Sequence, residues 1–350
     1  MDKLKRKISI ISIFSVLIVF FSFFIIFEKE EILVFDNSIP VEEFRVAFIA
    51  DQGYGPHSVA VLNLIKHEET DLVLHQGDFD YIDNPEKWDA QISSVLGNDF
   101  PYFASIGNHD VKAWGTIIPL PQPIPDLQLN WGGGYQEKLE NRLEKNPEIQ
   151  CLGKLGIESV CSYNNLLFVT VAPGIRDGEY DHYIDKQMSD SNFNWKICSW
   201  HLNMNAMQIG KKQDETGWEV YEACKRNGAM VVSGHDHSYA RTKTLIDFKQ
   251  QIVDPDWPKS DDLRLKQGSS FVIVSGLGGH SIRSQEKCFL TSEKNECNDI
   301  WASVYSQTQN ANFGALFCTF NVEKKNENAS CYFKNIDGEI IDSFTITNFT

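Results

Sequence analysis

Seven residues of this sequence carry side chains suited to holding a metal, and each follows a predicted strand. In chain order they are Asp51, Asp78, Tyr81, Asn108, His201, His235 and His237. Carboxylate, phenol and amide oxygens combined with imidazole nitrogens suit hard or borderline metals such as zinc, manganese and iron. Each residue type is common by itself, so the prediction of a metal centre rests on their joint placement and order along the chain.

The predicted elements explain why the first four donors would meet. Apolar segments at 44–50, 71–75 and 101–106 are typical of buried strands, and helices are predicted at about 57–69 and 85–96. This alternation indicates parallel strands joined by right-handed crossovers. Sheets of that kind build their sites at the carboxyl ends of the strands, where the donors lie. The fold class is therefore predicted to be α/β.

The second half of the chain places the three histidines in the same way. Strands are predicted at 166–171, 195–200, 229–232, 271–275, 315–322, 329–334 and 340–346. The strand at 195–200 runs into His201, and the strand at 229–232 runs into Gly234-His235-Asp236-His237. A helix is predicted at about 214–227 between them.

Residues 112–148 interrupt this pattern with alternating prolines, three consecutive glycines and a short polar helix. One interpretation is a plain surface excursion. The other is a loop insertion that shapes substrate access, because the segment leaves directly from the third polar cluster. The sequence favours neither over the other.

Composition and charge narrow the class of protein. The chain has 350 residues, of which 42% are hydrophobic and 23% charged, so disorder and coiled coil are excluded. Its formal net charge is −16. Nucleic-acid backbones are held by clustered Lys and Arg, so we expect no nucleic-acid partner. No protein partner can be inferred.

An uninterrupted apolar or hydroxyl-bearing run covers residues 8–27, long enough as a helix to cross about 30 Å of hydrocarbon. The basic residues before it predict a cytoplasmic N-terminus. We therefore predict a cytoplasmic basic tail at 1–7, a transmembrane signal anchor at 8–27, a linker at 28–43 and one extracytoplasmic domain at 44–350. A cleaved leader, which would give a secreted form, is the alternative.

All eight cysteines follow residue 150, and their even number agrees with export and disulfide formation. Closeness in sequence favours Cys151–Cys161, Cys288–Cys297 and Cys318–Cys331, which leaves Cys198 with Cys224. Eight cysteines allow 105 connectivities, so this pairing is a hypothesis.

The ordered motifs resemble the calcineurin-like metallophosphoesterase superfamily, and within it the purple acid phosphatases. The matching blocks are Asp51, Gly77-Asp78, Gly107-Asn108-His109-Asp110, His201 and Gly234-His235-Asp236-His237. Tyr81 follows Asp78 by three residues, as in the purple acid phosphatase block, and the last block continues to Arg241. Many superfamily members have Asp-x-His in the first block, where this chain has Asp51-Gln52-Gly53.

The resemblance implies a four-layer α/β/β/α sandwich and two metal ions. One metal would bind Asp51, Asp78, Tyr81 and His237, and the other Asp78, Asn108, His201 and His235. A bridging carboxylate screens the repulsion between two cations, and the metals turn bound water into hydroxide for attack on phosphorus. The family implies ferric iron at the tyrosine site, with ferrous iron, zinc or manganese beside it.

The resemblance also implies roles for other residues. His109 would protonate the leaving oxygen or bind phosphate, with Asp110 holding its orientation. Asn203, His280 and Arg241 are candidate substrate contacts. Purple acid phosphatases usually carry a histidine about nine residues after the one matching His201, where this chain has Gly210.

Three functions follow as hypotheses. The first is an acid phosphatase-like phosphomonoesterase that hydrolyses small phosphate esters by metal-activated hydroxide. The second is a phosphodiesterase acting on small nucleotides or lipid headgroups, because the same site hydrolyses either ester class. The third is a non-catalytic surface module that binds metal and phosphate.

Overall fold

The computed structural model describes residues 33–34, 42–115, 134–285, 287, 290–291, 294–295 and 299–349. Within these ranges no helix is both long and apolar enough to span a membrane. The predicted anchor at 8–27 and much of the predicted insertion, at 116–133, lie outside the described residues. The prediction of a signal anchor therefore stays a prediction.

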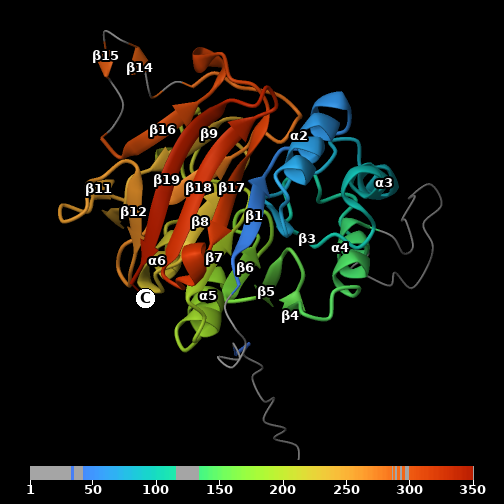
Figure 1. Ribbon diagram of the computed structural model, residues 1–350, viewed down its shortest axis with the longest axis horizontal. Coiled ribbons are helices and arrows are strands. Elements are labelled where there is room, and N and C mark those ends of the chain that lie inside the picture. Colours follow the sequence, from blue (N-terminus) through green and yellow to red (C-terminus); the bar gives the residue numbers. More distant parts are fainter. Residues whose placement is uncertain are drawn as a thin grey trace, which may run out of the picture. The chain divides into compact units, whose positions relative to one another are not determined.

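The first of two large sheets has seven strands in the order β12-β19-β18-β17-β1-β2-β3. The strands are β1 (Phe44–Ile49), β2 (Leu72–His75), β3 (Tyr102–Ala104), β12 (Asp262–Leu265), β17 (Gly314–Phe320), β18 (Asn328–Asn335) and β19 (Ile340–Asn348). Strands β1, β2 and β3 are parallel, as the sequence predicts, and β17 pairs antiparallel with β1. Figure 1 shows the C-terminal strands in red beside β1 in blue. The tail of the chain thus completes the sheet that its beginning starts.

The second sheet has eight strands in the order β16-β9-β13-β8-β7-β6-β5-β4. They are β4 (Gln150–Lys154), β5 (Glu158–Tyr163), β6 (Leu166–Val171), β7 (Trp195–Ser199), β8 (Met230–Ser233), β9 (Tyr239–Thr242), β13 (Val272–Ser275) and β16 (Trp301–Tyr305). Strands β6, β7, β8 and β13 form its parallel centre. Small hairpins comprise β10 (Leu245–Asp247) with β11 (Ile252–Val253) and β14 (Leu290–Thr291) with β15 (Lys294–Asn295).

The two sheets pack face to face and bury the core between them. The ring of Phe103 on β3 packs edge-on against Phe168 on β6, with centroids 4.5 Å apart. The Ser105 hydroxyl, just beyond the end of β3, donates to the carbonyl of Ser199, the last residue of β7, at 3.0 Å. Strand ends of one sheet are therefore fixed directly against strand ends of the other.

Helices cover the outer faces of the sheets (Figure 1). Helices α2 (Pro56–His67), α3 (Pro85–Leu96) and α4 (Tyr135–Leu143) pack with the first sheet and one another. Helices α5 (Tyr180–Met188) and α6 (Glu219–Arg226) pack together against the second. The result is a mixed α/β sandwich with the predicted α/β/β/α order of layers.

Local chemistry accounts for the helix starts. Helix α3 begins with Pro85 at its first position, where a missing amide hydrogen costs nothing, and the Asn84 side chain accepts from the Lys87 amide at 3.0 Å. Helix α6 begins at Glu219 instead of the predicted 214. Residue 214 lies instead in the preceding loop, where the Asp214 carboxylate accepts from the Asn205 amide at 2.7 Å.

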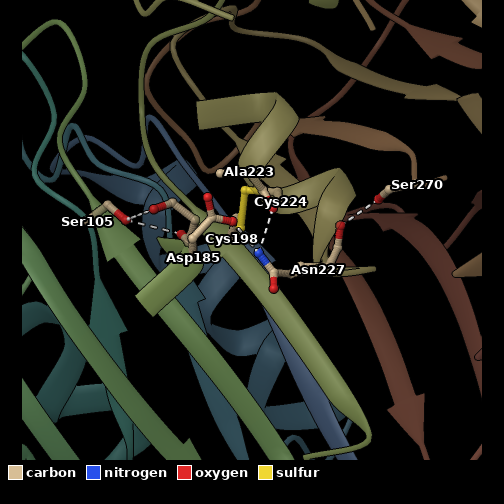
Figure 2. Close-up of a disulfide and its surroundings, with 9 residues drawn as sticks. Ser105, Asp185, Cys198, Ala223, Cys224, Asn227 and Ser270 are labelled. Carbon is tan, nitrogen blue, oxygen red and sulfur yellow. Dashed lines mark hydrogen bonds between the residues drawn. A yellow bond between two sulfur atoms is a disulfide. The ribbon is translucent and has the colours of Figure 1, made fainter. Parts of the chain in front are cut away.

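Three disulfides match predicted pairs: Cys151–Cys161, Cys198–Cys224 and Cys318–Cys331. The predicted pair Cys288–Cys297 lies outside the described residues. Figure 2 shows the Cys198–Cys224 bond joining β7 to α6. Both of these cysteines are fully buried, and Cys198 precedes His201 by three residues. The bond thus holds a helix against the strand that delivers a candidate ligand.

Removing the Cys198–Cys224 bond should destabilise the domain. The bond spans 26 residues, and loss of its constraint on the unfolded chain is worth about 3.5 kcal/mol. We expect Cys198→Ala combined with Cys224→Ala to lower the free energy of unfolding by about that amount in a denaturant titration. The matched control is Cys151→Ala with Cys161→Ala, whose separation of 10 residues gives about 2.7 kcal/mol. A clearly larger loss in the control would contradict this assignment.

Candidate metal centre

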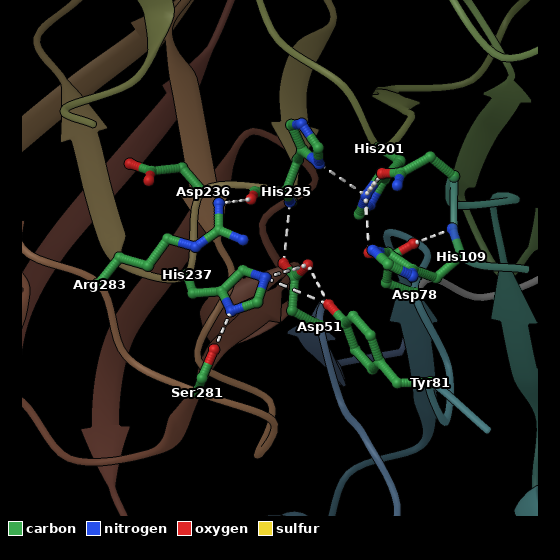
Figure 3. Close-up of polar contacts among 12 residues, drawn as sticks. Asp51, Asp78, Tyr81, His109, His201, His235, Asp236, His237, Ser281 and Arg283 are labelled. Atoms are coloured by element: carbon green, nitrogen blue, oxygen red, sulfur yellow. Dashed lines mark hydrogen bonds and ion pairs between the residues drawn. The ribbon is translucent and has the colours of Figure 1, made fainter. Parts of the chain in front are cut away.

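The seven predicted donors converge at the carboxyl ends of strands from both sheets. Asp51 follows β1, Asp78 and Tyr81 follow β2, and Asn108 lies beyond β3. His201 follows β7, and His235 and His237 lie in the turn after β8. Figure 3 shows Asp51 between the two histidines of that turn and Tyr81, with Asp78 and His201 beside them. The two sheets therefore contribute opposite sides of one site.

One group of donors consists of Asp51, Tyr81 and His237. The Tyr81 hydroxyl donates to Asp51 Oδ1 at 2.9 Å and lies 3.2 Å from His237 Nε2. His237 Nε2 is also 3.2 Å from Asp51 Oδ1, so the three atoms form a nearly regular triangle. Donors that share one ion at 2.0–2.2 Å stand about 3 Å apart, which matches this spacing.

A second group consists of Asp78, Asn108, His201 and His235. His201 Nε2 lies 3.1 Å from Asn108 Oδ1, 3.3 Å from Asp78 Oδ2 and 3.1 Å from His235 Nδ1. Ligand atoms of Asp78, His201 and His235 all fall within 4.8 Å of one another, and all three residues are buried. Acceptor atoms thus surround one imidazole nitrogen, an arrangement that a shared cation would satisfy.

Hydrogen bonds behind the imidazoles orient them. His201 Nδ1 lies 2.7 Å from the Gln76 carbonyl, which can only accept, so Nδ1 carries a proton and Nε2 is the nitrogen turned toward the other donors. His237 Nδ1 lies 2.5 Å from the Ser281 hydroxyl, which leaves Nε2 facing Asp51 and Tyr81. The fold therefore fixes the orientation of both rings, with Nε2 of each directed at the donor groups.

The backbone of the site is strained in a way that brings the donors inward. Asp51, Asp78, Tyr81 and His235 all adopt left-handed conformations, with φ between 55° and 68°. Such conformations cost of order 1–3 kcal/mol each in residues other than glycine and cluster at functional sites. Gly107 is needed beside them, because a Cβ there would lie 2.2 Å from the Asp78 amide nitrogen.

The site contains buried carboxylates that a cation would stabilise. Burial opposes ionisation of Asp51 and Asp78, yet the nearby imidazoles keep the pKa of both carboxyl groups below its usual value. Burial disfavours the charged form of His201, but the same carboxylates raise its pKa to about 9. Burial and the carboxylates raise the pKa of the Tyr81 phenol well above its usual value. Nearby positive charge thus stabilises the two buried carboxylates, and two metal ions would supply such charge.

Burial, together with the positive charges on His201 and Lys212, lowers the pKa of His235 to about 2. Its imidazole is therefore neutral and has a lone pair to offer. Carboxylate and phenol oxygens with neutral imidazole nitrogens are the donor set expected for zinc, manganese or iron. The residues present fit a dinuclear centre, with Asp78 between the two groups.

Asp110 differs from its predicted role. Its buried carboxylate accepts from the backbone amides of Gly107, Asp78 and Phe79 at 2.7–2.8 Å and makes no contact with the His109 ring among the described residues. Burial and the neighbouring Asp78 raise its pKa to about 8. Asp110 therefore joins the two donor-bearing loops, since three converging amides offer a better-directed partner than the imidazole.

His109 is exposed and lies against the site. Its backbone amide donates to Asp78 Oδ1 at 2.9 Å, and its ring packs 4.7 Å from that of Tyr81. His280 stacks on the opposite side, with ring centroids 3.5 Å apart and planes nearly parallel. Tyr81 is thus held between two imidazoles, and both predicted contact residues lie at the rim of the site.

Two predicted substrate contacts are corrected. Asn203 is fully buried; its amide donates to the Gly234 carbonyl at 2.7 Å and its oxygen accepts from Ser233 at 2.6 Å. Arg241 is 1% exposed and forms a two-pronged ion pair with Asp342 at 2.7 and 2.9 Å. That pair joins β9 of the second sheet to β19 of the first. Both side chains are committed to structure, because the core leaves them no path to substrate.

Four further residues lie near the site. Ser281 orients His237, as described above, while Lys212, Glu215 and Arg283 surround His235. None belongs to a motif, and only tertiary contact reveals Ser281, Glu215 and Arg283. The sequence does show that Gly210 replaces an expected histidine, and a Cβ at Gly210 would lie 2.4 Å from Asp236 Oδ1. A side chain at this position would therefore require the Asp236 carboxylate to move.

These motifs and this fold define a metallophosphoesterase. The family model for calcineurin-like phosphoesterases matches residues 44–239, more than half of the chain, and the chain belongs to that family. It is accordingly a hydrolase of the class that acts on phosphoric ester bonds. No curated protein sequence matches the chain significantly.

Solved structures share this fold. Purple acid phosphatase PPD1 from yellow lupin (Lupinus luteus) seeds aligns over 88% of this chain with a TM-score of 0.60 and 17% identity. This chain spans 54% of the lupin chain. PhoD aligns over 90% of this chain and 71% of its own, with a TM-score of 0.54 and 13% identity. GAP50, the anchor in the inner membrane complex of Plasmodium, aligns over 87% of this chain and 89% of its own. Its TM-score is 0.51 and its sequence identity is 13%.

The structural role of Arg241 can be separated from substrate binding. Arg241→Met leaves the buried Asp342 carboxylate without its cation, so the free energy of unfolding should fall by about 3–5 kcal/mol. The double change Arg241→Met with Asp342→Leu removes both charges and should recover most of that loss. Denaturant titrations measure both values, and the KM for a phosphate ester should stay unchanged in the double variant. A raised KM there would return Arg241 to the substrate site.

Proposed function

We propose that this protein is a dinuclear-metal phosphoesterase, with Asp51, Asp78, Tyr81 and His237 binding one metal and Asp78, Asn108, His201 and His235 the other. The observation that carries the proposal is the division of the seven donors into two groups, one around Asp51 and the other around His201, with spacings near 3 Å. A lone structural carboxylate–histidine pair would not require donors from five strand ends in two sheets.

Bound at these donors, two metal ions would activate water for attack on phosphorus and neutralise charge developing on the phosphoryl oxygens. The chain's own residues supply the rest. His201 and His237 are held in the ligating orientation by Gln76 and Ser281. The exposed His109 ring is placed to donate a proton to the leaving oxygen of the ester, a contribution typically worth 10²–10⁴ in rate.

For the metals, we propose ferric iron at the Tyr81 group and ferrous iron, zinc or manganese at the other. Tyr81 supports the first choice, because a phenolate favours a trivalent ion and two carboxylates flank it. For the substrate, we favour small phosphate monoesters. The alternatives are small diesters, such as nucleotides or lipid headgroups, and a module that binds metal without catalysis.

We also propose that the domain lies outside the cytoplasm, anchored through residues 8–27 or secreted if that leader is cleaved. The three disulfides support this location, because disulfides persist in oxidising compartments. A field from a net charge of −16 repels phosphate esters, so local cations at the site would have to attract them.

The full chain, purified in detergent and loaded with iron and zinc, tests the proposal. We expect about two metal ions per chain by elemental analysis, hydrolysis of 4-nitrophenyl phosphate, and slower hydrolysis of bis(4-nitrophenyl) phosphate. Tyr81→Phe should remove a visible charge-transfer band without preventing folding, while Asp78→Asn should lower metal content and activity together. Failure to bind metal under all loading conditions would refute the central claim. Metal binding without hydrolysis of either ester would favour the non-catalytic module.

His109 should act on the reaction without holding the metals. His109→Ala is expected to lower kcat for 4-nitrophenyl phosphate about 10²-fold or more, because leaving-group protonation is lost. Metal content should remain that of the parent protein, since His109 donates to Asp78 through its backbone amide and touches Tyr81 only by ring packing. The matched control is His67→Ala, a histidine on the outer end of α2. Unchanged kcat in His109→Ala would remove the assigned role.

A further inference from the structure

We propose that Lys212 and Arg283 form an anion-binding subsite beside the metal centre, which selects substrates carrying a second phosphoryl group next to the one that is hydrolysed. This inference rests on the proposed function, and it concerns residues that no motif includes. The chemical class it names is a diphosphate, whether inorganic or esterified.

Both cations reach the same ligand from different loops. Lys212 Nζ lies 2.8 Å from His235 Nε2, and Arg283 extends to the His235 carbonyl at 3.5 Å. Figure 3 shows the Arg283 side chain pointing toward His235 and His237. The two side chains are only half-buried, so an incoming anion can reach them.

The backbones that carry the two cations are fixed. The Arg283 amide donates to the His237 carbonyl at 2.9 Å, and its carbonyl accepts from Gln307 at 3.0 Å. The segment leading to Lys212 is held by Gly210, whose amide donates to Asp236 Oδ2 at 3.0 Å, and by the Asn205 side chain, which donates to the Lys212 carbonyl at 2.5 Å. Binding an anion would therefore cost little ordering of the chain.

The two ring nitrogens of His235 face different neighbours. Nδ1 faces His201 Nε2 within the second donor group, 3.1 Å away. Nε2 lies 2.8 Å from Lys212 Nζ and 2.9 Å from Glu215 Oε2. Glu215 Oε2 makes no hydrogen bond among the described residues, so it can accept from His235 while Lys212 turns to an anionic group.

The position of the subsite sets the size of the substrate. The metal-facing nitrogen of His235 and the nitrogen beside Lys212 belong to one imidazole ring, so the subsite lies directly next to the proposed metal. The carboxylates of Glu215, Asp51 and Asp78 all act on Lys212, and the last two are those that the proposed metals would neutralise, which leaves Lys212 and Arg283 as positive side chains beside the centre. A phosphoryl group adjacent to the reacting one fits this short separation, whereas a distant charge on a large substrate would not.

Calorimetric binding of two non-hydrolysable probes to the metal-loaded full chain tests the subsite without relying on activity. The probes are methylenediphosphonate, with two phosphonate groups, and methylphosphonate, with one. The parent protein should bind the diphosphonate at least tenfold more tightly. Lys212→Met and Arg283→Met should each weaken diphosphonate binding about tenfold and change methylphosphonate binding much less, because each removes one charge-assisted contact. The ratio of kcat/KM for pyrophosphate to that for 4-nitrophenyl phosphate should fall in parallel.

Lys243→Met is the matched control, since Lys243 pairs with Asp299 and contacts none of the donors. Lys212→Arg keeps the charge and should retain most of the diphosphonate preference. Equal affinity of the parent protein for both probes would overturn the inference, as would variants that weaken both probes equally. Failure to hydrolyse any ester would instead refute the proposed function. The calorimetric preference for the diphosphonate over methylphosphonate does not depend on hydrolysis and is judged separately.

Discussion

The rest of the structure depends on the burial of two carboxylates, Asp51 and Asp78, where the strand ends of two sheets meet. Buried charge is costly unless it is paired, and here the pairing groups are imidazoles delivered by the opposite sheet. Closing the sandwich therefore assembles the site, and the site in turn demands positive charge. This explains why loops with left-handed backbone and tightly packed glycines are tolerated at this place.

Around that centre, some polar side chains hold loops and sheets together, and others are exposed to substrate. Asp110 ties the loops after β2 and β3 together through backbone amides, Asn203 secures the turn after β8, and Arg241 joins the two sheets through Asp342. His109, in contrast, leaves its ring exposed at the rim. The buried polar side chains outside the seven donors thus serve positioning, whereas the exposed ring of His109 can meet a substrate.

The departures from the purple acid phosphatase pattern also have a physical reading. Gly210 stands where that family usually has a histidine, and the Asp236 carboxylate, which accepts from the Gly210 amide, occupies the space beside it. Lys212, Glu215 and Arg283 gather around His235 in its place. Charged side chains thus lie where a histidine would be expected near the site. This difference affects which substrates fit, and it leaves the seven donors unchanged.

The sequence by itself determined the order of strands and helices in the first half, the donors at their ends, and the family, because apolar periodicity and motif spacing are local properties. It also indicated three disulfide pairs that the structure contains. Tertiary structure alone decided which polar residues face the site. Asp110, Asn203 and Arg241 sit in or beside motifs yet turn to backbone, Ser233 or Asp342, while Ser281, Glu215 and Arg283 reach the site from loops outside the motifs. Side-chain direction depends on contacts between distant segments, and neither spacing nor composition encodes those contacts.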